Sequence, residues 1–232
     1  MRKTSFLAVF PLIAALTGYQ STLPAKASEP TLEQTAELYY RAWLNYDRAS
    51  AIRLNKALRL NKELRPESEG RDYIDMTMFN DPIAWQLKRM ATLTVKTDPS
   101  GRELRRLMAK LIVESSRRIR CSALGSRVGS EPAGGRFHAT VKLDCLVPDA
   151  VAELMQVKRS DEGADMINPT PRLLNSVIDA YARAPLTRRI ATEMDLTAGP
   201  AKERWMPSQY RTGIDLVTGG LIGQIKEAGL GR

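Results

Sequence analysis

Residues 117–148 read RRIRCSALGSRVGSEPAGGRFHATVKLDCLVP. Apolar and polar residues alternate in both halves of this stretch, and a period of two is typical of β-strands. The apolar set of the second half is Phe137, Ala139, Val141, Leu143, Cys145 and Val147. Between the halves, Glu131–Gly135 contains the Pro and Gly residues that favour a turn. The pattern therefore predicts a β-hairpin.

The only two cysteines of the chain, Cys121 and Cys145, set the register of this hairpin. Placing them opposite each other also aligns two apolar pairs, Ile119 with Val147 and Ala123 with Leu143. The same register brings Arg127 onto the apolar face, which predicts a β-bulge near Arg127 or Val128. A disulfide here would close a loop of about 25 residues and stabilise the fold by roughly 3–4 kcal/mol. Two buried free thiols are the alternative.

The first 27 residues have the pattern of a cleavable secretory signal. Arg2 and Lys3 precede an apolar run, Phe6–Leu16, that is too short to span a bilayer. Ala25–Ala27 has the A-x-A form of a cleavage site. We predict a bacterial periplasmic or secreted protein that begins at Ser28, has no transmembrane span and forms its disulfide in an oxidising compartment. An uncleaved N-terminal anchor is the alternative.

The predicted mature chain is basic and long enough for a sizeable core. Residues 28–232 are expected to form one domain. The net charge falls from +9 to +6 on cleavage, because three basic residues and no acidic residue are removed. Such an excess favours an anionic partner, such as lipid head groups, cell-wall polymer or an acidic protein. Nucleic acid is not an expected partner in this compartment. The excess charge also fits simple solubility.

Two groups of basic residues form a candidate binding surface. The first belongs to a predicted amphipathic helix and comprises Arg48, Lys56, Arg59 and Lys62. The second follows a chain break at Asp98–Gly101 and comprises Arg102, Arg105, Arg106 and Lys110. Basic amphipathic helices bind anionic membranes or acidic partners. If the groups are neighbours, they form one cationic surface; ordinary solvated helix faces are the alternative.

A helix rich in aromatic residues is predicted after a capping box at Thr31–Gln34. Its aromatic residues either line a pocket or belong to the core; they are Tyr39, Tyr40, Trp43 and Tyr46. The segment Leu38–Ser50 resembles the first helix of the NTF2-like superfamily, in which an aromatic pair precedes an Asn or Gly and an Asp. The resemblance implies a curved antiparallel sheet around a pocket. Residues 50–116, in contrast, have a helical pattern where that family has strands.

The C-terminal segment has an apolar stripe at helical spacing: Tyr210, Ile214, Val217, Leu221, Ile225 and Ala228. Four glycines interrupt it, although each glycine in a helix costs roughly 1 kcal/mol relative to alanine. Gly219 and Gly223 have the spacing that allows another element to approach the helix backbone. We expect a helix contact there, with the protein core, with a second copy in a homodimer, or with a membrane surface.

The residues required for most catalytic and metal sites are absent. His138 is the single histidine, and it falls on the polar face of a predicted strand. No phosphate-binding, dinucleotide-binding or nucleophile-elbow motif is present. We therefore expect no metal, no cofactor and no catalytic site, although a pair of carboxylates can meet in any fold.

These patterns predict an α+β fold, a helix-rich single domain around an antiparallel hairpin or small sheet with one disulfide. We expect a non-catalytic binding protein whose basic helices attract an anionic partner. One alternative is an inhibitor or immunity-type protein that blocks an enzyme. Another is a small-ligand enzyme of NTF2-like form.

Overall fold

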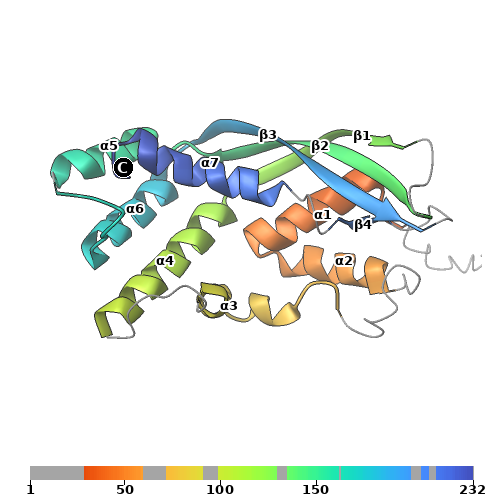
Figure 1. The fold of residues 1–232 in the computed structure, drawn as a ribbon, viewed down its shortest axis with the longest axis horizontal. Helices are drawn as coiled ribbons and strands as arrows, with labels where there is room; N and C mark the ends of the chain where they lie inside the picture. Colours follow the sequence, from red (N-terminus) through yellow and green to blue (C-terminus); the bar gives the residue numbers. More distant parts are fainter. Residues whose placement is uncertain are drawn as a thin grey trace, which may run out of the picture.

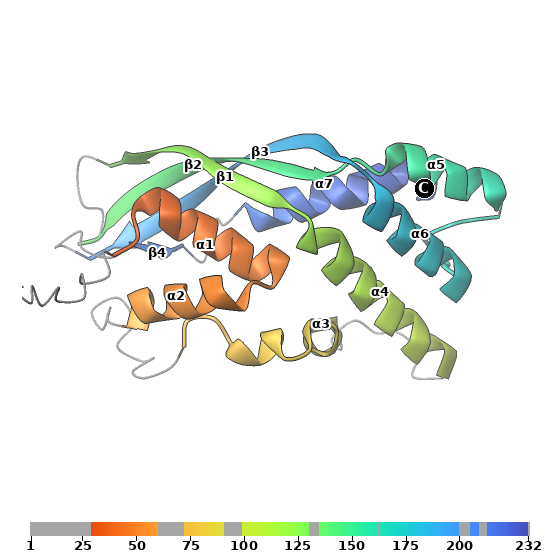
Figure 2. The same cartoon turned by 180° about the vertical axis from the view of Figure 1, so that it is seen from behind.

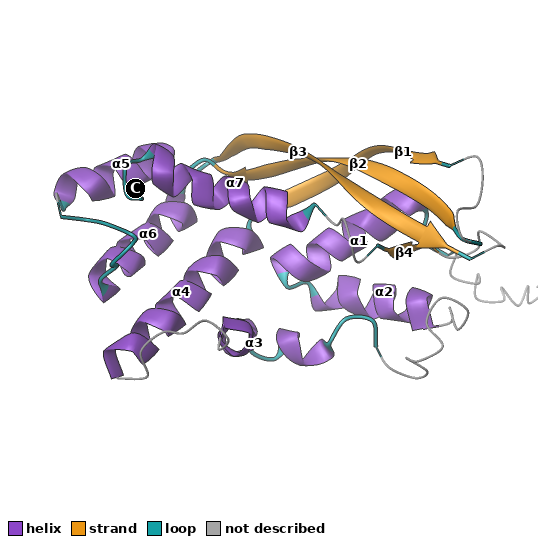
Figure 3. Ribbon diagram, in the orientation of Figure 1, coloured by secondary structure: helices purple, strands orange, loops and turns teal. Residues whose placement is uncertain are grey.

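The computed structural model describes residues 29–59, 72–90, 99–129, 135–161, 163–199, 205–208 and 213–231. Several predicted features fall outside these ranges, among them the signal peptide, Lys62, Tyr210 and most of the hairpin turn, Glu131 to Gly134. The described residues combine helices with an antiparallel sheet, as Figure 3 shows, and this confirms the α+β fold class.

The helices and strands alternate along the chain in blocks. The helices are α1 (Leu32–Asn45), α2 (Arg48–Arg59), the 3-10 helix η2 (Met76–Phe79), α3 (Pro82–Met90), α4 (Pro99–Arg117), α5 (Val151–Ser160), α6 (Pro171–Arg183) and α7 (Ile214–Glu227). The strands are β1 (Arg120–Val128), β2 (Phe137–Pro148), β3 (Leu186–Ala198) and β4 (Trp205–Pro207). None of the described helices is both long enough and apolar enough to cross a bilayer.

The hairpin has the predicted register. Cys121 pairs with Cys145 and Ala123 pairs with Leu143, while Ile119 lies just before the strand. The cysteines form a disulfide with an S–S distance of 2.02 Å. The predicted position of the bulge is wrong: the register shifts between Ala123 and Gly125, and Leu124 is 70% exposed. Because the shift comes earlier, Arg127 pairs on the solvent side and is exposed.

The sheet is larger than the hairpin, with the strand order β1-β2-β3-β4. Strand β3, to which the sequence analysis assigned no element, pairs with β2 along its whole length. Buried and exposed residues alternate along β2, with Val141 and Leu143 buried and Lys142 exposed. One face of the sheet therefore packs on the core and the other faces solvent.

Helices cover one face of the sheet in two layers (Figure 1 and Figure 2). Helices α1 and α7 lie against the sheet, whereas α2 and α3 lie farther away. Helix α4 leads into the start of β1 and extends away from the sheet, and α5 and α6 lie beyond one end of the sheet. The predicted capping box is present at the start of α1, where Thr31 and Gln34 satisfy each other's backbone N–H groups.

Polar side chains fasten the inner helices to the rest of the fold. Gln224 of α7 is fully buried, accepts the N–H of Ala150 at 2.6 Å and donates to the carbonyl of Pro148 at 2.9 Å. Glu37 of α1 accepts the N–H of Ala123 at 3.0 Å. That contact satisfies a backbone donor on edge strand β1, since edge strands otherwise present unpaired groups.

Candidate functional site

Helices α2, α3 and α4 form a strongly basic outer layer, which we call the basic helical layer. In both views α3 lies between α2 and α4, on the side of the molecule away from the sheet. The three helices contain eleven Lys and Arg residues but only two acidic residues, Glu103 and Glu114. Because α2 and α3 contain no acid at all, their positive charge is not neutralised within the helices themselves.

The structure places the predicted basic residues at two ends of this layer. Arg48 and Lys56 are exposed on α2, and Arg102 and Arg106 are exposed on α4. The two other predicted residues of α4 are half-buried; they are Arg105 and Lys110. Arg59 closes α2, but its side chain is outside the described part of the structure. The two groups therefore share one layer but are separated by α3.

Helix α3 adds two basic residues that the sequence analysis missed. Lys88 and Arg89 are both exposed in its last turn, between the two predicted groups. The absence of any acidic residue in α3 was the available sequence signal. Helix α3 therefore adds positive charge between the two groups, while three exposed acidic residues lie in the described part of the segment that joins α2 to α3: Asp72, Asp75 and Asp81.

Exposed apolar side chains lie among these charges. Ile52, which is 53% exposed, falls between Arg48 and Lys56 at steps of four along α2. On α4, Met108 and Ile112 are 37% and 38% exposed and follow Arg105 at helical spacing. Cationic and apolar groups on the same faces are typical of helices that bind membrane surfaces.

The aromatic residues of α1 extend from the core toward this layer. Tyr39 and Tyr40 are buried, whereas Trp43 and Tyr46 are half-buried. Tyr39 and Tyr40 belong to the buried core cluster, whereas Trp43 and Tyr46 pack against it and lie closer to the surface. Trp43 contacts Tyr39 on one side and Trp85 of α3 on the other, with ring centres 6.0 and 5.7 Å apart.

Two aromatic residues of this cluster were not identified from the sequence. The ring centres of Tyr73 and Tyr39 are 6.3 Å apart. The guanidinium carbon of Arg89 lies over the Trp85 ring, 4.9 Å from its centre. The Arg89 contact is a cation–π interaction, which holds a charge above an aromatic face. The cluster thus connects the buried middle of α1 with an exposed cation of the basic helical layer.

The C-terminal end of α1 positions both α3 and α4. Tyr46 adopts the left-handed conformation (φ 53°), and its hydroxyl accepts a hydrogen bond from Gln86 of α3 at 3.0 Å. The Asn45 side chain lies within 3.2 Å of the carbonyl of Ser116 and 2.8 Å of that of Ile119, donating to both. The layer is therefore anchored to the core by two adjacent residues.

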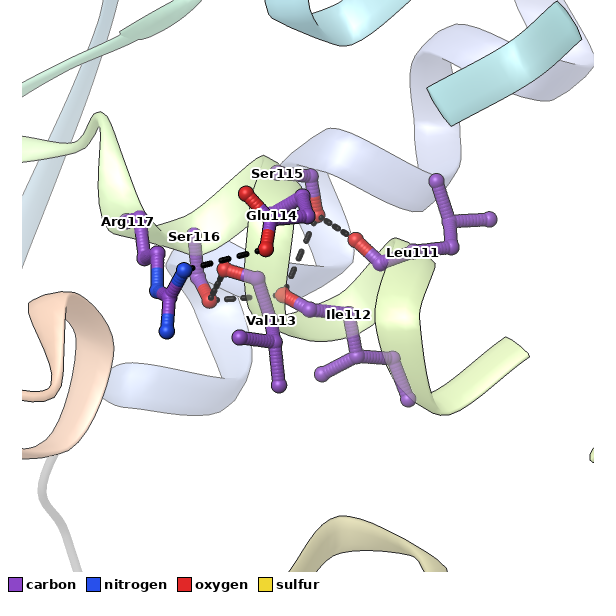
Figure 4. Close-up of polar contacts among 7 residues, drawn as sticks. All are labelled: Leu111, Ile112, Val113, Glu114, Ser115, Ser116 and Arg117. Atoms are coloured by element: carbon purple, nitrogen blue, oxygen red, sulfur yellow. Dashed lines mark hydrogen bonds and ion pairs between the residues drawn. The ribbon is translucent and has the colours of Figure 1, made fainter. Parts of the chain in front are cut away.

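The serines at the end of α4 are structural. Figure 4 shows the hydroxyls of Ser115 and Ser116 bonded to carbonyls of their own helix. Ser115 donates to Leu111 at 2.7 Å, and Ser116 donates to Ile112 at 2.6 Å. Both side chains are buried, so neither is accessible to a substrate.

Burial perturbs the acid–base behaviour of the aromatic cluster. It raises the pKa of Tyr40 to about 12, although the hydrogen bond with Thr192 acts in the opposite direction. Burial, together with nearby Tyr73 and Tyr40, raises the pKa of Tyr39 still further. The pKa of Tyr181 is raised as well, again mainly by burial.

We predict that the protein unfolds between about pH 10 and pH 12. An unfolded tyrosine ionises near pH 10, whereas folded Tyr40 keeps its proton to about pH 12. Stability is therefore complete below pH 10 and is lost as the pH rises through this interval. Tyrosinate absorbance and far-ultraviolet circular dichroism should change together, and Tyr40→Phe should move the transition to higher pH. Ionisation of the buried tyrosines near pH 10 without unfolding would contradict the burial.

The other candidate residues lie outside the basic helical layer. His138 is exposed on the solvent face of β2. Gly219 and Gly223 lie on α7 with open space around them, whereas a side chain at Gly220 would collide with Ile190. The close approach inside this chain is therefore at Gly220, and a contact at Gly219 and Gly223 stays a prediction.

Within the described ranges no other constellation points to a ligand. No three His, Cys, Asp or Glu residues of this part of the chain gather as metal ligands. A hollow lined in part by Thr35, Leu54 and Trp205 has a volume of about 10 Å³, which is room for one water molecule.

Comparison with known proteins identifies no relative: no family model, no curated protein and no solved structure matches the chain. The resemblance of α1 to the NTF2-like superfamily therefore stays a prediction. The basic helical layer is therefore the feature of the described structure from which a function can be inferred.

Proposed function

We propose that the protein is a non-catalytic binding protein of the bacterial cell envelope, and that its basic helical layer docks on an anionic lipid surface. The observation that carries the proposal is the charge imbalance of α2, α3 and α4, eleven basic residues against two acidic ones. Long-range attraction of this kind brings a protein to a negative surface and weakens with salt.

The exposed apolar residues favour lipid over an acidic protein. Ile52 of α2 and Met108 of α4 lie beside basic side chains, and insertion of such residues between head groups removes apolar area from water. Trp85 and Arg89 combine an amphipathic ring with a cation, a pairing suited to the membrane interface. The predicted signal peptide and the disulfide are consistent with a location outside the cytoplasm.

The test is co-sedimentation of residues 28–232 with vesicles of phosphatidylglycerol or of phosphatidylcholine. We expect binding to the anionic vesicles only, and a steep loss of binding at high salt. Arg102→Gln combined with Arg106→Gln should weaken binding about 30-fold, because each basic residue near an anionic surface contributes about 1 kcal/mol.

The matched control removes the same charge elsewhere. Arg127 on the solvent face of β1 and Arg172 on α6 are both exposed, so Arg127→Gln with Arg172→Gln should change binding less than about 3-fold. Equal loss in both double variants would show a net-charge effect and contradict a dedicated surface. A salt-independent interaction, or a stoichiometric complex with an acidic protein and no vesicle binding, would also overturn the proposal.

A further inference from the structure

Helix α7 has two faces of opposite character. One face packs on the core through Val217, Leu221 and Ile225. The opposite face is open to solvent although it carries two large apolar side chains, Leu216 and Ile222, which are 57% and 59% exposed. In Figure 1 this helix lies in front of the neighbouring elements, where no other helix covers it.

The two glycines of the open face have no explanation inside the described chain. No atom lies within 4 Å of the position where a Cβ of Gly219 or Gly223 would stand. Each glycine weakens a helix by roughly 1 kcal/mol relative to alanine, and here no intramolecular contact offsets that cost. Glycines that flank exposed apolar residues on one helix face allow a second helix to approach closely.

The charges on this face indicate which kind of helix can pack against it. Asp215 and Lys226 are exposed on it, and neither forms an ion pair with another described residue. A third charge on α7, Glu227, is already bound by both terminal nitrogens of Arg188, at 2.6 and 2.8 Å. The open face therefore offers one negative charge near its start and one positive charge near its end.

An antiparallel copy of α7 is complementary to this arrangement. Asp215 and Lys226 are equally far from the midpoint between Gly220 and Leu221. A two-fold axis at that midpoint places each Asp215 beside the Lys226 of the second copy, and it makes the interface isologous. The same axis sets Ile222 of each copy opposite Gly219 of the other, so that a large side chain meets a small one.

We propose that the protein forms a symmetric homodimer through the open faces of two antiparallel α7 helices. This contact is independent of the basic helical layer, which lies on other helices. A single pair of 14-residue helices is smaller than a standard interface, so the dissociation constant should be on the order of 10–100 µM.

The test is sedimentation equilibrium of the mature chain from about 5 to 500 µM, a range that brackets this affinity. Wild type should pass from monomer to dimer. Asp215→Lys alone and Lys226→Asp alone should each weaken the dimer about 10-fold or more, since each replaces two attractive pairs with two repulsive ones. The double variant, which exchanges the two charges, should restore the dimer. Glu103→Lys on α4 makes the same charge change as Asp215→Lys and should leave the dimer intact.

A second variant separates dimerisation from folding. Gly219→Leu adds a side chain where the monomer has open space, so the monomer should be at least as stable as wild type. The same side chain prevents close approach of two helices, so the dimer should be lost. A wild type that stays monomeric throughout, or charge variants that do not compensate, would overturn the proposal. If the protein is monomeric and Ile222→Ser abolishes its binding to vesicles, the open face of α7 binds lipid and the dimer proposal is wrong.

Discussion

Replacing Gly213 with alanine should lower the free energy of unfolding by about 3 kcal/mol. Gly213 immediately precedes α7 and has a φ of 69°, a left-handed conformation that costs an L-residue roughly 1–2 kcal/mol. A Cβ at this position would also stand 2.6 Å from both the carbonyl oxygen of Glu193 and the hydroxyl of Tyr40. Relief of that overlap requires movement of α7 or β3, which typically costs 1–3 kcal/mol.

Gly229 provides the matched control for this substitution. It has a similar φ of 73°, but no atom lies within 4 Å of its Cβ position. Gly229→Ala should therefore cost only the backbone term, about 1 kcal/mol. Urea unfolding of both variants, with free energies extrapolated to water, measures the difference. Equal losses for the two substitutions would contradict the close packing around Gly213.

Removal of the disulfide should cost about 3.5 kcal/mol. Cys121 and Cys145 are 24 positions apart, and the chain-entropy model assigns this value to a closed loop of that size. The preferred variant is Cys121→Val with Cys145→Val, because valine keeps the β-propensity and the apolar volume of two buried positions. Its stability should be compared with that of the oxidised wild type by denaturant unfolding.

The reduced wild-type protein distinguishes the cross-link from the side chains. Reduction leaves both sulfur atoms in place and removes only the bond, so reduced wild type and the double valine variant should lose similar stability. If the oxidised protein were no more stable than the reduced one, the loop-closure account would be wrong.

The hairpin could be predicted because its information is local. Alternation fixed which residues of β2 face the core, and the cysteine pair then left one register for β1. The bulge was misplaced because Arg127 is the first charged residue that strict alternation brings onto the apolar face, whereas the register already shifts between Ala123 and Gly125. Gly125 has no side chain to indicate a face, so alternation gives no signal at the true position.

Strand β3 was harder to identify although it alternates as well. Met194 and Leu196 face the core, but Arg188 and Thr192 occupy the same side nearer its start. Polar residues on the inward side dilute the signal for a half-buried strand. What makes this segment a strand is tertiary pairing with β2, whose contribution does not appear in a local window.

The sequence predicts which residues of the candidate site are basic, but it does not predict that the helices carrying them form one layer. The basic residues of α2 and α4 follow from helical spacing, whereas their inclusion in one layer depends on α3. Helix α3 is held by contacts between distant parts of the chain, such as Tyr46 with Gln86 and Trp43 with Trp85. Contacts between residues this far apart in the chain cannot be read from the spacing of residues in a single sequence.

The path of the chain through the sheet has a consequence for biogenesis. Strand β2 is completed at Pro148, but its inner neighbour β3 begins only at Leu186, after α5 and α6. While the chain is being made, the hairpin can therefore form before the twelve-residue edge of β2 that later binds β3 is paired. An uncovered strand edge is a template for pairing between chains. Until the second half of the chain arrives, this edge can pair with another molecule unless a chaperone or a low local concentration prevents it.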